Sequence, residues 1–382
     1  MLYTLEHRDS SGARAGLLDL PHGRVETPVF MPVGTNATVK AIGPEALEQL
    51  GVTLILSNAY HLYLRPGAEV IRSAGGLHAF MGWERNILTD SGGYQIFSLA
   101  SLRRITEGGV EFRSHLDGSA LHLSPEEVVE FQQLLGSDVL MPLDICTPPG
   151  IAEPEARQAV ERTLAWADRS LRAWKSGGSG GKGGQLFGIV QGNFFPALRR
   201  QSAERTAELG FPGLAIGGLS VGESFGVFRD LLALTAALLP QDRPRYLMGV
   251  GTPQYILEAV ENGVDMMDCV FPTRTARNAQ AFTRRGPLNL RNESNRLASG
   301  PIDPGCSCPT CRRHSRAYLR HLFKSREILA AMLATRHNLH FLQTLMRDIR
   351  QAIGEGRFAA FKRSFLDGYR TGLDEGPPDA EQ

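Results

Sequence analysis

Eight short apolar runs recur along the chain, and they constrain its fold more than any other feature. They span residues 29–33, 54–57, 87–89, 139–143, 186–190, 214–216, 246–250 and 264–270. Each run ends in a small or polar residue, and each except the last is followed by a loop and a helical pattern. Their hydrophobicity is continuous rather than alternating, as in strands buried on both faces of a parallel sheet. Eight such units close into a (β/α)₈ barrel, the TIM-barrel class of α/β fold.

The segments between the runs contain two clear helix patterns. Over 154–174 apolar residues share one face and charged residues the other, with Pro154 at the start. Ser124 is the expected N-cap of another helix, because two acids follow Pro125 at the positive end of the helix dipole.

Two further segments interrupt the repeat. Residues 91–123 are longer than one strand–helix loop needs, and the runs 110–113 and 121–123 around Asp117-Gly118 predict a β-hairpin inserted over the barrel mouth. The glycine- and serine-rich stretch 176–184 predicts a flexible loop before the fifth strand.

Polar residues follow the predicted strands at equivalent places. They are Asn58, Asp90, Asp144, Gln191, Gly217-Gly218, Gly249 and, near the end of the eighth run, Asp268. Each has an ordinary explanation alone, as an Asx-turn, a helix cap or a loop hydrogen-bonder. Their coincidence predicts one shared site, because barrel active sites form at the C-terminal ends of the strands.

Asp268 stands out because it is a carboxylate within an apolar run, where burial is costly without a partner. Arg274 and Arg277 follow it on a predicted loop and turn. This arrangement favours chemistry on a phosphate-bearing substrate. The alternative, a turn-capping acid with two solvated arginines, is equally compatible with this stretch alone.

The charge distribution is uneven. Between residues 271 and 326 there are twelve Lys or Arg residues and two acids, Glu293 and Asp303, which gives a net charge of +10. The whole chain has a net charge of +1, so the remainder carries −9. This asymmetry predicts an anionic partner on the basic segment.

Three of the five cysteines, Cys306, Cys308 and Cys311, lie within six residues and predict a structural zinc site. A fourth ligand is needed, and spacing leaves the downstream histidines open: His314, His321, His337 and His340. His337 is favoured because the helical segment 315–334 precedes it. We therefore expect a barrel over 1–270 and a basic zinc-binding subdomain with C-terminal helices packed on the barrel over 271–382.

The N-terminal residues are too polar for a signal peptide, and the longest helical apolar stretch, 231–239, is too short for a membrane span. We expect a cytoplasmic protein that does not contact a membrane.

Several motifs, in order from residue 31 to 337, together resemble the tRNA-guanine transglycosylases. They are TDSGGYQ at 89–95, GIVQG at 188–192, GGLSVGE at 217–223, DCVFPTR at 268–274, and Cys306-X-Cys308-X₂-Cys311 followed by His337. The resemblance implies a (β/α)₈ barrel with a zinc subdomain, and exchange of guanine at the tRNA wobble position for 7-aminomethyl-7-deazaguanine (preQ1), a queuosine precursor. It also suggests a homodimer.

The resemblance implies roles for individual residues. Asp268 would be the nucleophile and Asp90 the general acid and base. Base-binding residues would be Asp144, Gln191, Gly218 and Leu219, with Tyr94 and Met248 sandwiching the base, and with Cys146 and Val221 as in the bacterial type. Zinc would be held by Cys306, Cys308, Cys311 and His337. The expected tRNA phosphate contacts are Arg274, Arg277, Arg284 and Arg285.

The chemistry of base exchange agrees with these residue types. Retention at an anomeric carbon requires double displacement through a covalent intermediate, with a second acid to manage the proton. The target nucleotide must also leave the stack to be reached. One departure is Gly192-Asn193, where the family has Gly-Gly.

Three alternatives differ in testable ways. An archaeosine-type relative would have a longer C-terminal region than the roughly fifty residues after His337. A non-catalytic tRNA-binding partner subunit would lack the nucleophile or the acid, and both are present. A zinc hydrolase would need histidines at the strand ends; only His61 follows a strand closely.

Overall fold

The eight predicted strands form a single parallel sheet. The structure is a computed structural model that describes residues 1–93, 95, 103–177 and 183–369. The strands are β4 (Val29–Pro32), β5 (Leu54–Asn58), β6 (Asn86–Asp90), β10 (Val139–Leu140), β11 (Gln185–Val190), β12 (Gly213–Ile216), β13 (Arg245–Leu247) and β14 (Met266–Cys269). Their order is β4-β14-β13-β12-β11-β10-β6-β5, and a parallel bridge between Val33 and Leu56 joins the two ends. The (β/α)₈ barrel is confirmed.

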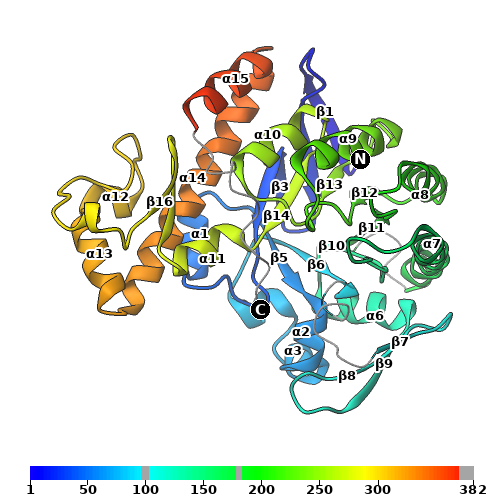
Figure 1. Ribbon diagram of the computed structural model, residues 1–382. Helices are drawn as coiled ribbons and strands as arrows, with labels where there is room; N and C mark the ends of the chain where they lie inside the picture. The colour runs from blue at the N-terminus through cyan, green and yellow to red at the C-terminus, as the bar shows by residue number, and fades with distance from the viewer. Residues whose placement is uncertain (94, 96–102, 178–182, 370–382) are drawn as a thin grey trace.

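Helices surround this barrel (Figure 1). They are α1 (Pro44–Gln49), α2 (Ala59–Leu64), α3 (Ala68–Ser73), α4 (Leu77–Met81), α6 (Pro125–Leu135), α7 (Glu153–Ser176), α8 (Pro196–Glu208), α9 (Phe225–Leu238) and α10 (Pro253–Glu261). The helix predicted at 154–174 is α7. Ser124 caps α6 as predicted, in a capping box with Glu127, whose side chain accepts from the Ser124 N–H.

Side chains along each strand alternate between the barrel interior and the helix layer. In β14, Met266 packs in the interior cluster with Met31, whereas Met267 packs in the outer cluster with Phe30. Asp268, two residues after Met266, pairs in register with Met31. The two-residue period therefore turns the Asp268 side chain inward at the C-terminal end of the barrel.

An antiparallel sheet that was not predicted adjoins the N-terminal end of the barrel. It consists of β1 (Tyr3–Arg8), β2 (Arg14–Leu20) and β3 (Gly23–Thr27). Asp265, which directly precedes β14 and is fully buried, accepts hydrogen bonds from Tyr3 Oη (2.8 Å) and Arg14 Nε (3.0 Å). Arg14 also forms an ion pair with Asp265, so the buried charge is matched.

The segment before α6 contains three antiparallel strands, β7 (Arg103–Ile105), β8 (Val110–Arg113) and β9 (Ala120–Leu123). Strands β8 and β9 form a hairpin, with Val110 opposite Leu123. The apolar side chains of this sheet pack against Tyr60 and Trp166. Residues 178–182 of the predicted glycine-rich loop lie outside the described residues.

After β14 the chain leaves the barrel and forms a C-terminal region. It contains α11 (Phe271–Arg277), β15 (Gln280–Thr283), β16 (Gly286–Asn289), the 3₁₀ helix η1 (Glu293–Asn295), α12 (Pro309–Arg313), α13 (Arg316–Lys324), α14 (Ile328–Gly354) and α15 (Phe358–Gly368). In this region β16, α12 and α13 make a lobe to one side of the barrel, while α14 and α15 pack against the barrel (Figure 1). Most buried apolar residues between Ala276 and Ala334 form their own hydrophobic cluster, whereas Phe282 packs in the barrel's outer cluster. Leu342 of α14 and Phe358, the first residue of α15, belong instead to the barrel's outer core.

One local prediction in this region was wrong. Arg274 and Arg277 lie on helix α11, not on a loop and turn, because Pro272 stands in the first turn, where proline is well tolerated. The segment 315–334 is helical as predicted, and it comprises α13 and the start of α14. Arg326 adopts a left-handed conformation (φ 59°), which ends the first helix before α14 begins.

Within the described part of the chain, no helix has both the length and the hydrophobicity needed to cross a membrane.

Candidate active site and metal centre

Asp268 is the next-to-last residue of β14, and only 8% of its surface is exposed. One carboxylate oxygen, Oδ1, accepts hydrogen bonds from Tyr246 Oη (2.6 Å) and the Gly249 backbone N–H (2.9 Å). Burial raises the pKa of Asp268 to about 6, although these two donors favour the charged form and lower it. The carboxylate is therefore held in place and ionises near neutral pH.

Asp90 ends β6 beside Asn58, the last residue of β5, which pairs with it in register. The Asn58 amide donates to Asp90 Oδ2 at 3.2 Å. Burial raises the pKa of Asp90, and the hydrogen bonds from Asn58 and Gln95 oppose this shift. The charge of Asp90 in turn raises the pKa of Asp268, so the two carboxyl groups influence each other electrostatically.

Asp144 and Gln191 lie together after β10 and β11. The Gln191 side-chain amide donates to Asp144 Oδ2 at 2.7 Å. Burial, together with the charge of Asp90, raises the pKa of Asp144 to about 7, against the effect of the Gln191 hydrogen bond. Asp144 and Gln191 follow different strands, and the structure brings them into direct contact. A carboxylate and an amide therefore lie side by side at this end of the barrel.

Two glycines let the backbone approach this pair closely. A Cβ atom on Gly218 (φ 65°) would lie 2.5 Å from Gln191 Oε1. A Cβ atom on Gly93 would lie 2.3 Å from Asp144 Oδ1. Any other residue would therefore displace the polar groups that line the site.

Arg199 was not identified from the sequence, although it connects two loops of the site. It is fully buried on α8; its Nε donates to the Asn193 carbonyl (2.8 Å) and its Nη2 to the Gly218 carbonyl (2.9 Å). Asn193, the departure from the family's glycine, donates through Nδ2 to Thr147 Oγ1 at 2.8 Å. The loops after β10, β11 and β12 are thus joined by buried hydrogen bonds.

The remaining predicted base-binding residues lie around these loops. Leu219 and Cys146 are buried, while Met248 and Val221 are partly exposed. Glu223 accepts from the backbone N–H groups of both Ser220 and Val221, which fixes the loop after β12. Tyr94 lies outside the described residues.

The predicted metal ligands form one cluster in the lobe beside the barrel. Nδ1 of His337 lies 3.7, 3.5 and 3.3 Å from the sulfur atoms of Cys306, Cys308 and Cys311. His340 approaches only Cys306, at 3.7 Å, so His337 completes the set. The other His337 nitrogen, Nε2, lies 2.6 Å from the Phe282 carbonyl, which orients Nδ1 toward the sulfur atoms. This cluster can hold a metal ion.

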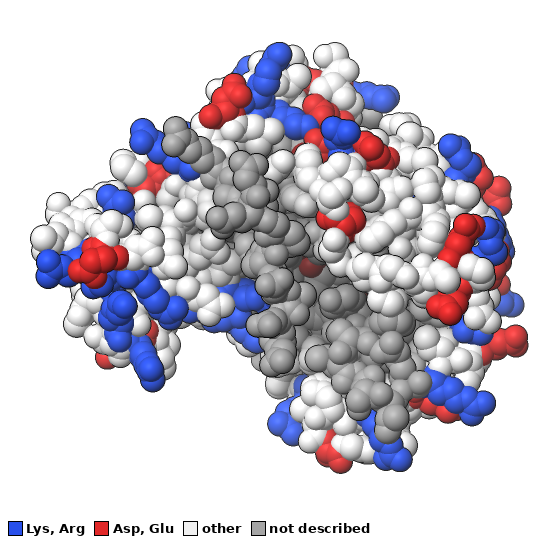
Figure 2. Space-filling view, in the orientation of Figure 1, with Lys and Arg blue, Asp and Glu red and all other residues white. Residues whose placement is uncertain are grey.

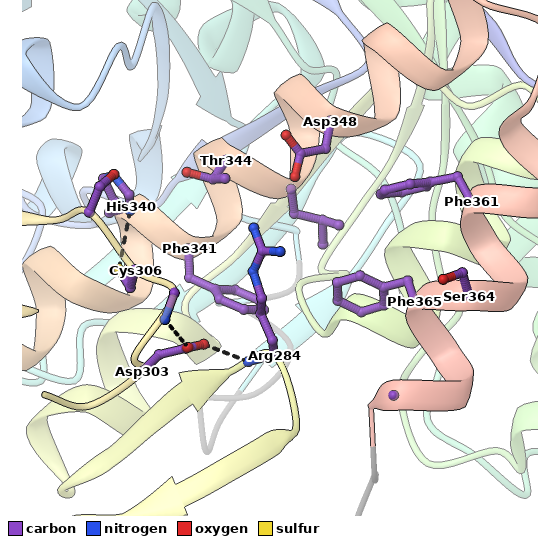
Figure 3. A pocket seen from close by; sticks show the side chains of 14 residues that line it. Arg284, Asp303, Cys306, His340, Phe341, Thr344, Asp348, Phe361, Ser364 and Phe365 are labelled. Atoms are coloured by element: carbon purple, nitrogen blue, oxygen red, sulfur yellow. Dashed lines mark hydrogen bonds between the residues drawn. The ribbon is translucent and has the colours of Figure 1, made fainter. Parts of the chain in front are cut away.

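The loop that carries Cys306 is fixed from the other side. Asp303 accepts through Oδ2 from the Arg284 backbone N–H (2.7 Å) and through Oδ1 from the Gly305 N–H (3.1 Å) (Figure 3). The Arg284 side chain itself lines a cavity of about 330 Å³ together with His340 and Phe365.

The chain matches a family model described as queuine tRNA-ribosyltransferase over residues 9–371. The chain belongs to the queuine tRNA-ribosyltransferase family. A curated member from Thermoanaerobacter pseudethanolicus is 54% identical over 368 residues, covering 96% of this chain and 97% of the relative. Another, from Treponema denticola, is 50% identical over 374 residues, covering 98% of each.

The lobe beside the barrel carries many positively charged side chains. Lys and Arg side chains gather on the lobe that carries α12 and α13 (Figure 2). Glu293 there forms ion pairs with Arg296 and Arg320. Within the described ranges, Arg274, Arg277, Arg284 and Arg285 form no ion pair with an acidic side chain. Their charges are not neutralised within the lobe.

His61, the histidine nearest a strand end, contacts the His115 ring at a centroid distance of 5.8 Å. Two groups of side chains among the described residues could hold a metal ion, and His61 belongs to neither of them. The zinc-hydrolase alternative therefore has no supporting feature at the strand ends described here.

Proposed function

We propose that this chain replaces guanine at the wobble position of tRNA with preQ1, using Asp268 as the nucleophile. As a member of its family it is a tRNA-guanine transglycosylase, a pentosyltransferase of queuosine biosynthesis. The observation that carries the residue assignment is the asymmetry of the Asp268 carboxylate. Both hydrogen bonds go to Oδ1, and no described residue donates to Oδ2, so Oδ2 is the oxygen for attack.

In the first displacement, Oδ2 of Asp268 forms a bond to C1′ of the target ribose while the bond from C1′ to guanine N9 breaks. The electron pair of that bond leaves with guanine. In the second displacement, N9 of the incoming base attacks C1′ from the opposite side and releases the Asp268 carboxylate. Two inversions retain the configuration, and no nucleoside triphosphate is consumed.

Asp90 is the proposed acid and base. Burial raises its pKa, which favours the protonated form needed to give a proton to the departing guanine. The incoming base then loses its N9 proton, which restores protonated Asp90. Asp90 therefore gives up one proton and regains one in each complete exchange.

Asp144 and Gln191 are the proposed partners of the base edge. Guanine offers N–H donors at N1 and N2 and an acceptor at O6. A carboxylate can accept from both donors, and an amide or a backbone N–H near Gly218 and Leu219 can donate to O6. Met248 and Tyr94 would stack on the two faces of the base, and Cys146 and Val221 would line its remaining edge.

The basic lobe is the proposed tRNA contact. Arg285 lies at the tip of the β15–β16 hairpin, whose two-residue turn is Arg284-Arg285 between the paired residues Thr283 and Gly286. On α11, Arg274 is exposed and Arg277 is partly exposed. Unpaired guanidinium donors beside the nucleophile's strand suit tRNA phosphate oxygens.

The cysteine–histidine cluster is proposed to hold one structural Zn²⁺. Three thiolates and one imidazole are a common closed zinc set with no position left for substrate. The ion would stabilise the lobe that carries the arginines, and we propose a division at residue 270 between barrel and lobe. The separate hydrophobic cluster of this lobe supports the division.

Exposed hydrophobic side chains on the C-terminal region support a proposed homodimer. Large hydrophobic side chains are exposed over a short part of the chain: Leu297 (82%), Tyr318 (39%), Ile328 (79%), Leu329 (41%) and Met332 (45%). Exposed apolar groups concentrated in one region are typical of a protein–protein contact.

The test is incorporation of radiolabelled guanine into unmodified tRNA with a wobble guanosine, comparing the wild type with Asp268→Asn. We expect incorporation by the wild type only, and a denaturation-resistant protein–RNA adduct only when Asp268 is present. An adduct in Asp268→Asn would refute the nucleophile. No incorporation by a wild type that still binds tRNA would favour the non-catalytic subunit.

A further inference from the structure

A second group of metal-binding side chains lies at the opposite end of the barrel from the proposed active site. It comprises His22, His78 and Asp138. Nδ1 of His22 lies 2.6 Å from Asp138 Oδ1, and Nε2 of His78 lies 3.1 Å from Asp138 Oδ2. The two imidazole rings stack with centroids 3.7 Å apart and an interplanar angle of 18°.

Each of the three side chains is held by a separate part of the fold. His22 is the second residue of the two-residue turn between β2 and β3, because Leu20 pairs directly with Gly23. Its backbone N–H donates to Asn86 Oδ1 at 3.1 Å, and Asn86 Nδ2 donates to the Gly23 carbonyl at 3.0 Å. The hairpin tip is therefore fixed to the start of β6.

Asp138 directly precedes β10 and is fully buried. Its Oδ2 also accepts from the Ile87 backbone N–H at 2.7 Å, which fixes the plane of the carboxylate. His78 lies on the short helix α4 with 14% of its side chain exposed. The cluster thus joins the N-terminal sheet, the strand β6, the strand β10 and α4.

The charges of this cluster are unbalanced when both imidazoles are neutral. Among the residues that the structure describes, no lysine or arginine pairs with Asp138; its ion-pair partners are the two histidines. A buried carboxylate without a cation is costly. A bound proton or a bound metal ion would supply the missing positive charge.

We propose that His22, His78 and Asp138 bind one divalent transition-metal ion of the zinc type, separate from the cysteine site. Two imidazole nitrogens and one carboxylate oxygen suit Zn²⁺ and its neighbours rather than Mg²⁺ or Ca²⁺, which prefer oxygen ligands. Tetrahedral metal–ligand bonds of about 2.0–2.2 Å place neighbouring ligand atoms roughly 3.3–3.6 Å apart. The nitrogen–oxygen distances, 2.6 Å from His22 to Oδ1 and 3.1 Å from His78 to Oδ2, run to different carboxylate oxygens and are shorter than that spacing. Metal binding therefore requires each imidazole to move away from the carboxylate by less than about 1 Å.

The location of the site indicates a structural role. Barrel chemistry occurs at the C-terminal ends of the strands, whereas this cluster lies at their N-terminal ends, where conserved features serve stability. The His22 side chain is 38% exposed, so an ion can enter from solvent. Bound metal would fasten the β2–β3 hairpin to the barrel and stabilise the folded state by mass action.

The experiment uses the full chain with its cysteine site already loaded. Zinc is added at micromolar free concentration, and zinc per chain is measured by mass spectrometry after equilibrium dialysis. We expect about two zinc ions per wild-type chain and about one in the double variant His22→Gln/His78→Gln. His122→Gln, which removes an exposed histidine 3.4 Å from Glu127, is the matched control and keeps both ions.

Thermal unfolding gives a second readout. Zinc should raise the melting temperature of the wild type and of His122→Gln, and leave that of the double variant unchanged. A wild type that binds one zinc ion only, or a double variant that keeps two, would overturn the proposal. In the first case, the histidines and Asp138 form a hydrogen-bonded cluster without metal.

Discussion

The Tyr246 hydroxyl donates a 2.6 Å hydrogen bond to Oδ1 of Asp268, and both groups are buried inside the barrel. The bond stabilises the charged carboxylate against burial, which raises the Asp268 pKa to about 6. Tyr246→Phe removes this donor and should raise that pKa further. A hydrogen bond to a charged group contributes about 1.5–3 kcal/mol, and one pKa unit corresponds to about 1.4 kcal/mol.

The nucleophile reacts as the carboxylate, so exchange should fall as the pH drops through the Asp268 pKa. In Tyr246→Phe, we expect this acid limb of the pH–rate profile to move up by about one unit. The control is Tyr3→Phe, which removes a similar bond to a buried carboxylate, Asp265, at the other end of the barrel. An acid limb that stays in place in Tyr246→Phe would contradict the assignment of Asp268.

The two neighbouring histidines of α14 should differ in their effect on metal binding. His337 contacts all three cysteine sulfur atoms, whereas His340 contacts only Cys306. After dialysis against metal-free buffer, His337→Gln should lose the zinc ion and unfold at lower temperature, because metal binding is coupled to folding. His340→Gln should retain one zinc ion per chain, measured by atomic emission. Equal retention in both variants would exclude His337 as a ligand.

Arg285 at the hairpin tip should contribute to tRNA binding mainly through charge. Arg285→Ala should weaken binding to all tRNAs and lower the slope of log K against log salt by about one. The matched control is Arg200→Ala on α8, whose side chain lies 3.9 Å from Glu204 and whose removal should leave the slope unchanged. Filter binding at several salt concentrations measures both. An unchanged slope in Arg285→Ala would exclude a phosphate contact.

The barrel was predictable because buried parallel strands leave a direct signal in the sequence. Continuous apolar runs placed all eight strands within a few residues of β4 to β14. Asp90 directly follows such a run and Asp268 lies near the end of one, so both could be placed at the C-terminal end of the barrel. The spacing of the cysteines also predicted that Cys306 and His337 belong to one cluster, and the structure brings them together.

Other features leave no such signal. The sheet β1–β3 was missed because β1 buries only Tyr3 and β3 buries only Val25 and Thr27, so neither strand has a continuous apolar run. Tyr246 and Arg199 act through contacts across strands and helices, which spacing along the chain does not reveal. His22 and Asp138 are separated by more than a hundred residues and meet only because the hairpin folds against the start of the barrel strands.

Asp144 should reduce the stability of the fold at neutral pH. Its pKa is raised from 3.8 in an unfolded chain to about 7 by burial and by the charge of Asp90. The folded state therefore binds a proton that the unfolded state has released, and stability falls as the pH rises between these values. No described lysine or arginine forms an ion pair with Asp144, whose partner is Gln191. Asp144→Asn keeps an acceptor for that amide and removes the buried charge.

We therefore expect Asp144→Asn to increase the free energy of unfolding at pH 8 by about 2–4 kcal/mol, and to reduce the affinity for guanine. At pH 5 the gain in stability should be much smaller, because wild-type Asp144 is then protonated. Asp265→Asn is the opposite case: it leaves buried Arg14 without its carboxylate and should lower stability by about 3–5 kcal/mol. Urea unfolding at both pH values measures these differences. A loss of stability in Asp144→Asn at pH 8 would show that the carboxylate is stabilised in the fold, and that base recognition does not oppose stability at this position.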